Sequence, residues 1–145
     1  MRLRIAFFAI VLACVASLPL QAQVKYRSSV QATYRANTAE AAAVKRWLID
    51  RASRTEQGQL LGDFDSLGET TVRVDTPSPG NTFSDPYPPV PLPAGGSPGQ
   101  TIGISSCGGE ISQQWVYLWV GTSGNGGWVL QSYSFTRVKS CASNA

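Results

Sequence analysis

The clearest pattern of hydrophobic and polar positions lies in the C-terminal third of the chain. Two runs rich in aromatic and β-branched residues, 112–120 and 128–138, flank a Gly/Ser/Asn connector at 121–127. Such runs on either side of a turn-forming connector predict a β-hairpin. Three of the four tryptophans lie in this hairpin, and Cys107 and Cys141 bracket it. We therefore expect the sheet to be built around it.

Residues 39–54 have the composition and spacing of one amphipathic helix. Good helix formers dominate the segment. Val44, Trp47 and Leu48 recur at the three- and four-residue spacing of a single helix face. Asn37 precedes the segment and matches a helix N-cap. The pattern predicts an N-terminal helix whose apolar stripe covers a sheet.

Two shorter strands and a proline-rich segment are predicted between the helix and the hairpin. Residues 69–75 alternate as a half-buried strand does, and residues 101–107 form a short β-rich run. Residues 76–100 hold eight of the nine prolines. Because proline has no backbone N–H to donate, we interpret this segment as a spacer or wrapping loop outside the sheet.

These elements predict a small α+β domain. One N-terminal amphipathic helix packs on a small antiparallel sheet of three or four strands, built around the C-terminal disulfide-bracketed hairpin. The predicted boundaries are 1–22 for a signal peptide, 23–75 for the helix and first strand, 76–100 for the spacer or wrapping loop, and 101–145 for the hairpin unit. Residues 23–145 are long enough for one domain.

The two cysteines help to choose between two registers of the hairpin. A two-residue turn at 125–126 makes paired residue numbers sum to 251, which places Cys107 opposite Asn144. A seven-residue loop at 121–127 makes the sum 248, which places Cys107 opposite Cys141. Because a disulfide needs α-carbons within about 7 Å, we expect the second register and a Cys107–Cys141 bond.

In this register the hairpin has an aliphatic face and an aromatic face. The aliphatic face, expected to pack on the helix, carries Val116, Leu118, Val120, Trp128 and Leu130. The aromatic face is the candidate binding surface and carries Trp115, Tyr117, Trp119, Gln131, Tyr133 and Phe135, with Val129 beside them. Tryptophan and tyrosine suit surfaces that stay partly wet. The alternative is a covered face, packed under the proline-rich loop, the 69–75 strand or a second subunit.

The first 22 residues have the pattern of a secretory signal peptide. Basic residues precede an apolar core at 5–18, and Ala22 is a small residue at the expected cut. The 14-residue core is shorter than the roughly 20 residues of a membrane span. We expect cleavage between Ala22 and Gln23, and a secreted or periplasmic protein.

Removal of the signal peptide changes the number of cysteines and the net charge of the mature chain. Two cysteines then remain in an oxidising compartment, where one disulfide is the expected outcome. Residues 11–14 loosely resemble a bacterial lipobox, so a lipoprotein acylated at Cys14 is the alternative. The mature chain keeps ten of the twelve basic residues and all nine acidic ones, a net charge of about +1. Nothing in this balance favours nucleic acid or a membrane surface as a partner.

Little in the chain indicates catalysis, a metal or a cofactor. There is no histidine, which removes the commonest general base. Asp63 and Asp65 have the spacing that opens an EF-hand calcium loop, but Leu67 replaces the third ligand and Val74 the closing glutamate. A polar turn with one of these aspartates as a cap is the simpler interpretation. We expect no enzyme, no metal and no cofactor.

We therefore expect an exported, non-catalytic binding protein that uses its aromatic hairpin face. The partner would be a protein or a glycan at the cell envelope or outside the cell. The alternative is a structural or assembly subunit of an envelope, appendage or virion complex, with the same face buried against copies of itself as a homo-oligomer. A third interpretation is a secreted hydrolase that uses Asp63 and Asp65. We expect no nucleic-acid partner and no stable membrane span after signal cleavage.

Overall fold

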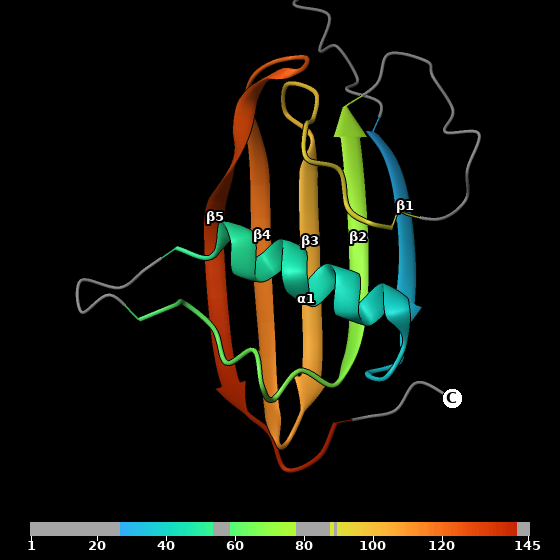
Figure 1. The fold of residues 1–145 in the computed structure, drawn as a ribbon, viewed down its shortest axis with the longest axis vertical. Coiled ribbons are helices and arrows are strands. Elements are labelled where there is room, and N and C mark those ends of the chain that lie inside the picture. The colour runs from blue at the N-terminus through green and yellow to red at the C-terminus, as the bar shows by residue number, and fades with distance from the viewer. Residues whose placement is uncertain (1–26, 54–58, 78–87, 89, 142–145) are drawn as a thin grey trace, which may run out of the picture.

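The chain forms a five-stranded antiparallel sheet with one helix across one of its faces (Figure 1). This computed structural model describes residues 27–53, 59–77, 88 and 90–141. The elements are β1 Arg27–Tyr34, α1 Ala39–Arg51, β2 Glu69–Pro77, β3 Thr101–Gly108, β4 Ile111–Thr122 and β5 Asn125–Arg137. The strands lie side by side in chain order, and each is antiparallel to its neighbours.

The predicted fold class is wrong in the position of the helix, because a strand precedes it. β1 pairs with β2 along its whole length, and α1 follows β1. The positions of β1 that face the helix side are Ser28, Val30, Ala32 and Tyr34, of which only Val30 is fully buried. The other three positions are only partly buried and include Ser28 and Ala32, so the apolar alternation of β1 is weak. With β1 included, the protein is mostly a five-stranded sheet with one short helix.

The helix itself is close to the prediction. It begins at Ala39, after Thr38, whose hydroxyl oxygen accepts a hydrogen bond from the Ala41 backbone N–H at 3.2 Å. Thr38 rather than Asn37 is therefore the N-cap. The predicted stripe is confirmed as buried: Val44, Trp47 and Leu48 all face the sheet side of the helix.

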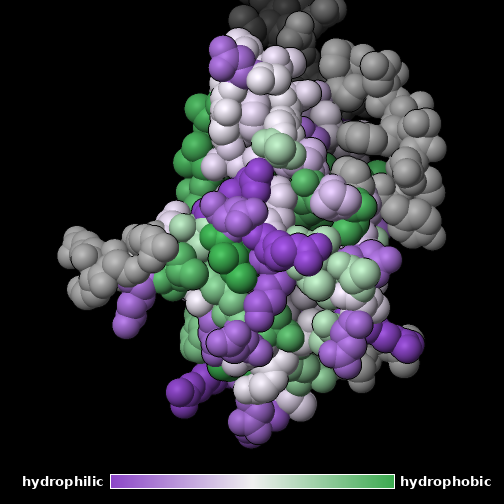
Figure 2. All heavy atoms as spheres, viewed as in Figure 1, coloured by the Kyte–Doolittle hydropathy of each residue, from purple (hydrophilic) through white to green (hydrophobic). Residues whose placement is uncertain are grey.

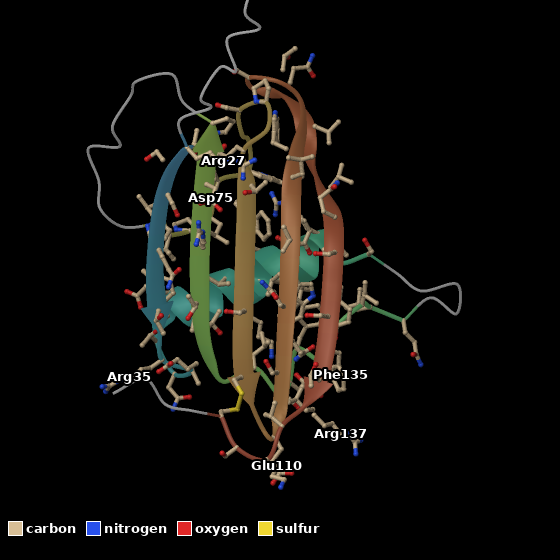
Figure 3. All side chains as sticks on the ribbon, turned by 180° about the vertical axis from the view of Figure 1, so that it is seen from behind. Arg27, Arg35, Asp75, Glu110, Phe135 and Arg137 are labelled. Carbon is tan, nitrogen blue, oxygen red and sulfur yellow. A yellow bond between two sulfur atoms is a disulfide. The ribbon has the colours of Figure 1, made fainter. Side chains whose placement is uncertain are left out.

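The core lies between α1 and the central strands. Its most deeply buried members on the sheet are Val72, Val74, Ile102, Ile104, Trp115 and Tyr117. The burial of these apolar side chains against the helix stripe is the main favourable term for folding. Among the residues that the structure describes, no helix lies over the opposite face of the sheet (Figure 3).

The proline-rich segment packs on the helix side of the sheet where the structure describes it, at residues 88 and 90–100. Pro88 and Leu92 are buried. The carbonyl oxygen of Pro93 accepts hydrogen bonds from two indole N–H groups, Trp47 Nε1 at 3.1 Å and Trp128 Nε1 at 3.2 Å. These bonds tie the segment to both the helix and β5.

Replacing Gly96 by alanine is expected to disturb this packing. An added Cβ would lie 2.8 Å from one Trp128 ring atom and 2.9 Å from one Trp119 ring atom. Because each indole is held by its N–H hydrogen bond, neither ring moves away easily. We expect the free energy of unfolding, measured in urea, to fall by about 1–3 kcal/mol.

Gly95→Ala is the matched control for that variant. Its Cβ would lie 3.9 Å from the nearest Trp119 atom, an ordinary contact. We expect a change of about 0.5 kcal/mol or less, as for other surface substitutions. Equal losses at Gly95 and Gly96 would mean that the segment is not docked on the two indoles.

The hairpin keeps the predicted register over only half its length. Paired residue numbers sum to 248 from Ile111 to Val116, and to 247 from Tyr117 to Thr122. The change is a β-bulge in which Gln131 is the additional residue of β5. The strands then close on a two-residue turn at 123–124, so the predicted seven-residue loop is wrong.

The bulge changes the predicted faces of the first half of β5. A shift of one residue turns residues 125–130 to the other face relative to the predicted register. Trp128 therefore lies opposite Trp119, and Val129 lies opposite Leu118. The prediction that the aliphatic face packs on the helix is wrong, because the buried face of β4 is the aromatic one.

The predicted disulfide is confirmed, but for a different geometric reason. Cys107 and Cys141 are bonded, with α-carbons 5.5 Å apart. Cys107 lies in β3 opposite Ser112, rather than in the hairpin opposite Cys141. After β5 the chain turns back, held by a 2.8 Å hydrogen bond from the Val138 N–H to the Glu110 carbonyl, and Cys141 then reaches β3 (Figure 3). Such a bond is compatible with an oxidising compartment.

The predictions about export concern residues outside the described ranges. The signal peptide, its cleavage site and Cys14 all fall within residues 1–26. Within the described residues, no helix has the length and apolar character needed to cross a membrane.

Candidate functional site on the β4–β5 hairpin

Three of the six predicted binding residues lie in the core. The exposed fractions of Trp115, Tyr117 and Trp119 are 1%, 1% and 3%. Trp115 lies beneath the loop before β2, Tyr117 beneath α1 and Trp119 beneath the proline-rich segment. These three rings are therefore unavailable for stacking on a ligand in this conformation.

Trp115 holds the loop before β2 against the sheet. Its ring stacks on Phe64 at a centroid distance of 5.9 Å, and its Nε1 donates to the Leu61 carbonyl at 3.2 Å. On its other side it contacts Tyr133 of β5, with ring centroids 5.4 Å apart. The residue acts as a packing centre between two strands and a loop.

Tyr117 is buried against the helix. Its ring meets Trp47 edge to face at a centroid distance of 5.0 Å. Its hydroxyl is buried and has no hydrogen-bond partner among the described residues. Burial raises the pKa of this phenol to about 12, with Arg51 acting weakly in the opposite direction. The phenol therefore stays neutral near pH 7.

Trp119 joins the same aromatic cluster from the other end of β4. Its Nε1 donates to the Thr122 carbonyl at 2.9 Å, and its ring meets Trp128 edge to face at 5.4 Å. Trp128 in turn lies 6.2 Å from Trp47 of the helix. Helix, hairpin and proline-rich loop are thus joined through three indoles.

Gln113 is a structural residue that the sequence reasoning missed. It is 1% exposed, and its side-chain amide holds the loop at Asp63 from both sides. Its Oε1 accepts from the Asp63 N–H at 2.7 Å and from the Tyr133 hydroxyl at 2.9 Å, while its Nε2 donates to the Asp63 carbonyl at 2.7 Å. The sequence feature that points to this residue is its position on β4. It lies two residues before Trp115, which places both side chains on the same face of the strand.

Asp63 and Asp65 form a polar turn. Asp63 accepts from the backbone N–H groups of Asp65 and Ser66 and from the Ser66 hydroxyl, at 2.7–3.2 Å. These hydrogen bonds, led by the Ser66 hydroxyl, lower the pKa of Asp63. Asp65 is exposed and pairs with Lys45 of the helix at 3.3 Å. The two carboxylates therefore have structural partners, and the described residues contain no cluster suited to a metal ion.

The remaining predicted residues lie on or near β5. Tyr133 is half-buried, whereas Gln131 at the bulge is exposed. Phe135 is 47% exposed on the helix-side face of β5, and Val120 and Val129, on the open face, are 50% and 45% exposed. Figure 2 shows hydrophobic side chains along the β5 side of the molecule above the helix.

We define the hairpin surface as the free edge of β5 together with Val120, Val129 and Phe135. β5 pairs with β4 on one side and is the last strand of the sheet, so its other edge has no neighbour in the described sheet. The sequence from Ile111 to Thr136 contains no Asp, Glu, Lys or Arg. Exposed edges are commonly protected by such charges, and this one is not.

The other edge strand differs. β1 is eight residues long, against thirteen for β5, and begins with the charged Arg27. Its exposed side chains are polar, and none of the exposed large hydrophobic residues lies on it. Each edge strand carries one arginine, so it is the length and the exposed apolar side chains that are specific to the hairpin edge (Figure 3, where Phe135 and Arg137 mark the end of β5).

Comparison with known proteins gives no family for this chain. No family model, no curated protein and no solved structure matches it. The hairpin surface is therefore the basis for inferring the function.

Proposed function

We propose that this protein is an exported, non-catalytic binding protein that recognises a protein partner through the hairpin surface. The observation that carries the proposal is the edge of β5: thirteen residues long, unpaired in the described sheet and uncharged up to Arg137. An extended segment of a partner adds to such an edge by main-chain hydrogen bonds, and neighbouring side chains supply specificity.

The exposed apolar side chains support a protein partner. Val120 and Val129 are diagonal neighbours on the open face, since Val120 lies opposite Gly127. Phe135 lies on the helix-side face of β5. A partner strand along β5 would contact side chains on both faces, as main-chain pairing requires.

A protein partner is favoured over a glycan because of where the rings are. Glycan recognition by the aromatic face rests on flat, exposed indoles, and Trp115 and Trp119 are buried. Trp128 uses its N–H on the Pro93 carbonyl and contacts two other indoles. Phe135 is the ring with the largest exposed fraction among the described aromatic residues.

The absence of catalysis is part of the proposal. The chain has no histidine. The carboxylate that the hydrolase interpretation requires, Asp63, accepts three hydrogen bonds in a turn. The Tyr117 phenol is neutral and buried. The Asp63 carboxylate and the buried Tyr117 ring contribute to the fold.

Site-specific photo-cross-linking in the producing cell tests the proposal. A benzophenone side chain placed at Val129 or at Phe135 is expected to yield covalent adducts with a protein, because both positions border the β5 edge. The control is Ile49 of α1, a similarly exposed hydrophobic residue at 38%. We expect adducts from the hairpin positions at least about fivefold more abundant than from Ile49, consistent with a specific interface. Equal or absent adducts at all three positions would contradict the proposed function.

A further inference from the structure

We propose that the partner at the β5 edge is a second copy of this chain. The two β5 strands pair antiparallel about a twofold axis and join two five-stranded sheets into one of ten strands. This inference rests on the proposed function and names its partner. The inference is based on the edge being complementary to itself. Its main chain, its side chains and its charge all allow two copies to pair.

The main chain allows this pairing without any further sequence requirement. A twofold contact uses the same surface on both copies, so an edge that can pair antiparallel with itself is complete as an interface. β5 is the longest strand of the sheet and ends it on one side. Its N–H and C=O groups on the outer side alternate as in any strand and find matching groups on an antiparallel copy.

The bulge selects the half of β5 that pairs. Gln131 interrupts the regular strand, and residues 132–137 beyond it are regular. A twofold axis at Ser134, the centre of residues 132–136, places Phe135 beside Tyr133 of the second copy. It also places Ser132 beside Thr136 of the second copy. Aromatic residues that are direct cross-strand neighbours interact favourably, and the half-exposed Phe135 ring gains a neighbour.

Charge does not oppose this arrangement. The only charged residue of β5 is Arg137, at its end. With the axis at Ser134, Arg137 lies opposite Gln131 of the second copy, roughly 20 Å from that copy's Arg137 at about 3.3 Å per residue. This separation exceeds the screening length of about 8 Å at physiological ionic strength. Two copies therefore meet along an uncharged edge.

The mass of the purified, oxidised protein in solution tests the inference. Sedimentation equilibrium at micromolar concentration is expected to give twice the mass of one chain. Ser134→Lys places two like charges at the twofold axis, and we expect it to raise the dimer dissociation constant at least about 100-fold. Ser134 is exposed, so the substitution leaves the core intact.

Ser29→Lys is the matched control on the other edge of the sheet. Ser29 is also exposed, and it lies opposite Asp75, which tolerates a new lysine. We expect this variant to remain a dimer. If Ser134→Lys fails to fold by circular dichroism, Phe135→Lys makes the test instead, because Phe135 is exposed and its two copies lie two residues apart across the axis, about 7 Å at about 3.3 Å per residue.

Three outcomes would overturn the inference. They are a monomeric wild-type protein, a dimer that persists in the folded β5 lysine variant, and a dimer lost in Ser29→Lys. Each leaves the proposed function to the cross-linking result. Adducts at Val129 and Phe135 that contain a different protein would support the proposed function. They would reject a second copy of this chain as the partner.

Discussion

Trp119→Ala is expected to lower the free energy of unfolding by about 3–5 kcal/mol, the usual range for a deleted buried aromatic side chain. The Trp119 ring is 3% exposed and packs against Trp128, and its N–H bonds the Thr122 carbonyl. Removing it leaves a cavity beneath the proline-rich loop, which cannot close without breaking other indole contacts. Urea denaturation of variant and wild type, followed by circular dichroism, measures the loss.

Val129→Ala is the control, because Val129 lies on the opposite face of the same hairpin and is 45% exposed. We expect it to change stability by about 0.5 kcal/mol or less. A loss of under about 1 kcal/mol at Trp119 would contradict the buried position of the ring. It would also restore the exposed aromatic platform as a candidate binding surface.

Removing the disulfide is expected to cost about 3–4 kcal/mol of stability in the chain-entropy account. The bond joins residues 34 apart and so encloses the whole β4–β5 hairpin. Without it, the unfolded chain gains conformational freedom, and the segment after β5 loses its attachment to β3. The double variant Cys107→Ser/Cys141→Ser, compared with wild type in urea, measures the difference.

Reduction provides the internal control for that prediction. A reductant should shift the wild-type midpoint to that of the double variant and leave the variant unchanged. Free-thiol titration of the denatured, oxidised protein should find neither Cys107 nor Cys141. Two titratable thiols, or a loss of less than about 1 kcal/mol, would count against a stabilising bond.

The parts of the fold that the sequence predicts are those with strong, regular patterns. The helix stripe at Val44, Trp47 and Leu48 has a clear 3–4 spacing and is buried as expected. The two middle strands and the hairpin have β-rich alternation, and they form β2, β3, β4 and β5. The disulfide is predictable from the count of two cysteines in the predicted mature chain, even though Cys107 lies in β3 and not in the hairpin opposite Cys141.

The parts that are not predicted depend on single residues or on tertiary context. The extra residue at Gln131 changes the face of residues 125–130 relative to the predicted register, and no composition signal marks it. β1 carries only one fully buried residue, Val30, so its alternation is too weak to identify a strand next to the helix. The candidate site changes because the aromatic face of β4, and not its aliphatic face, packs under the helix, and alternation along a strand does not show which face is covered.

The double hydrogen bond to the Pro93 carbonyl gives the protein an intrinsic optical reporter. Trp47, Trp119 and Trp128, three of the four tryptophans, form consecutive ring contacts, and two of them bond the same oxygen. Ring contacts at these separations hold the indoles in a fixed, asymmetric environment, so the near-ultraviolet circular dichroism of tryptophan should report on this cluster. Release of the Pro93 segment would change the spacing and hydration of the rings together. Docking of the loop can therefore be followed by spectroscopy without any added label.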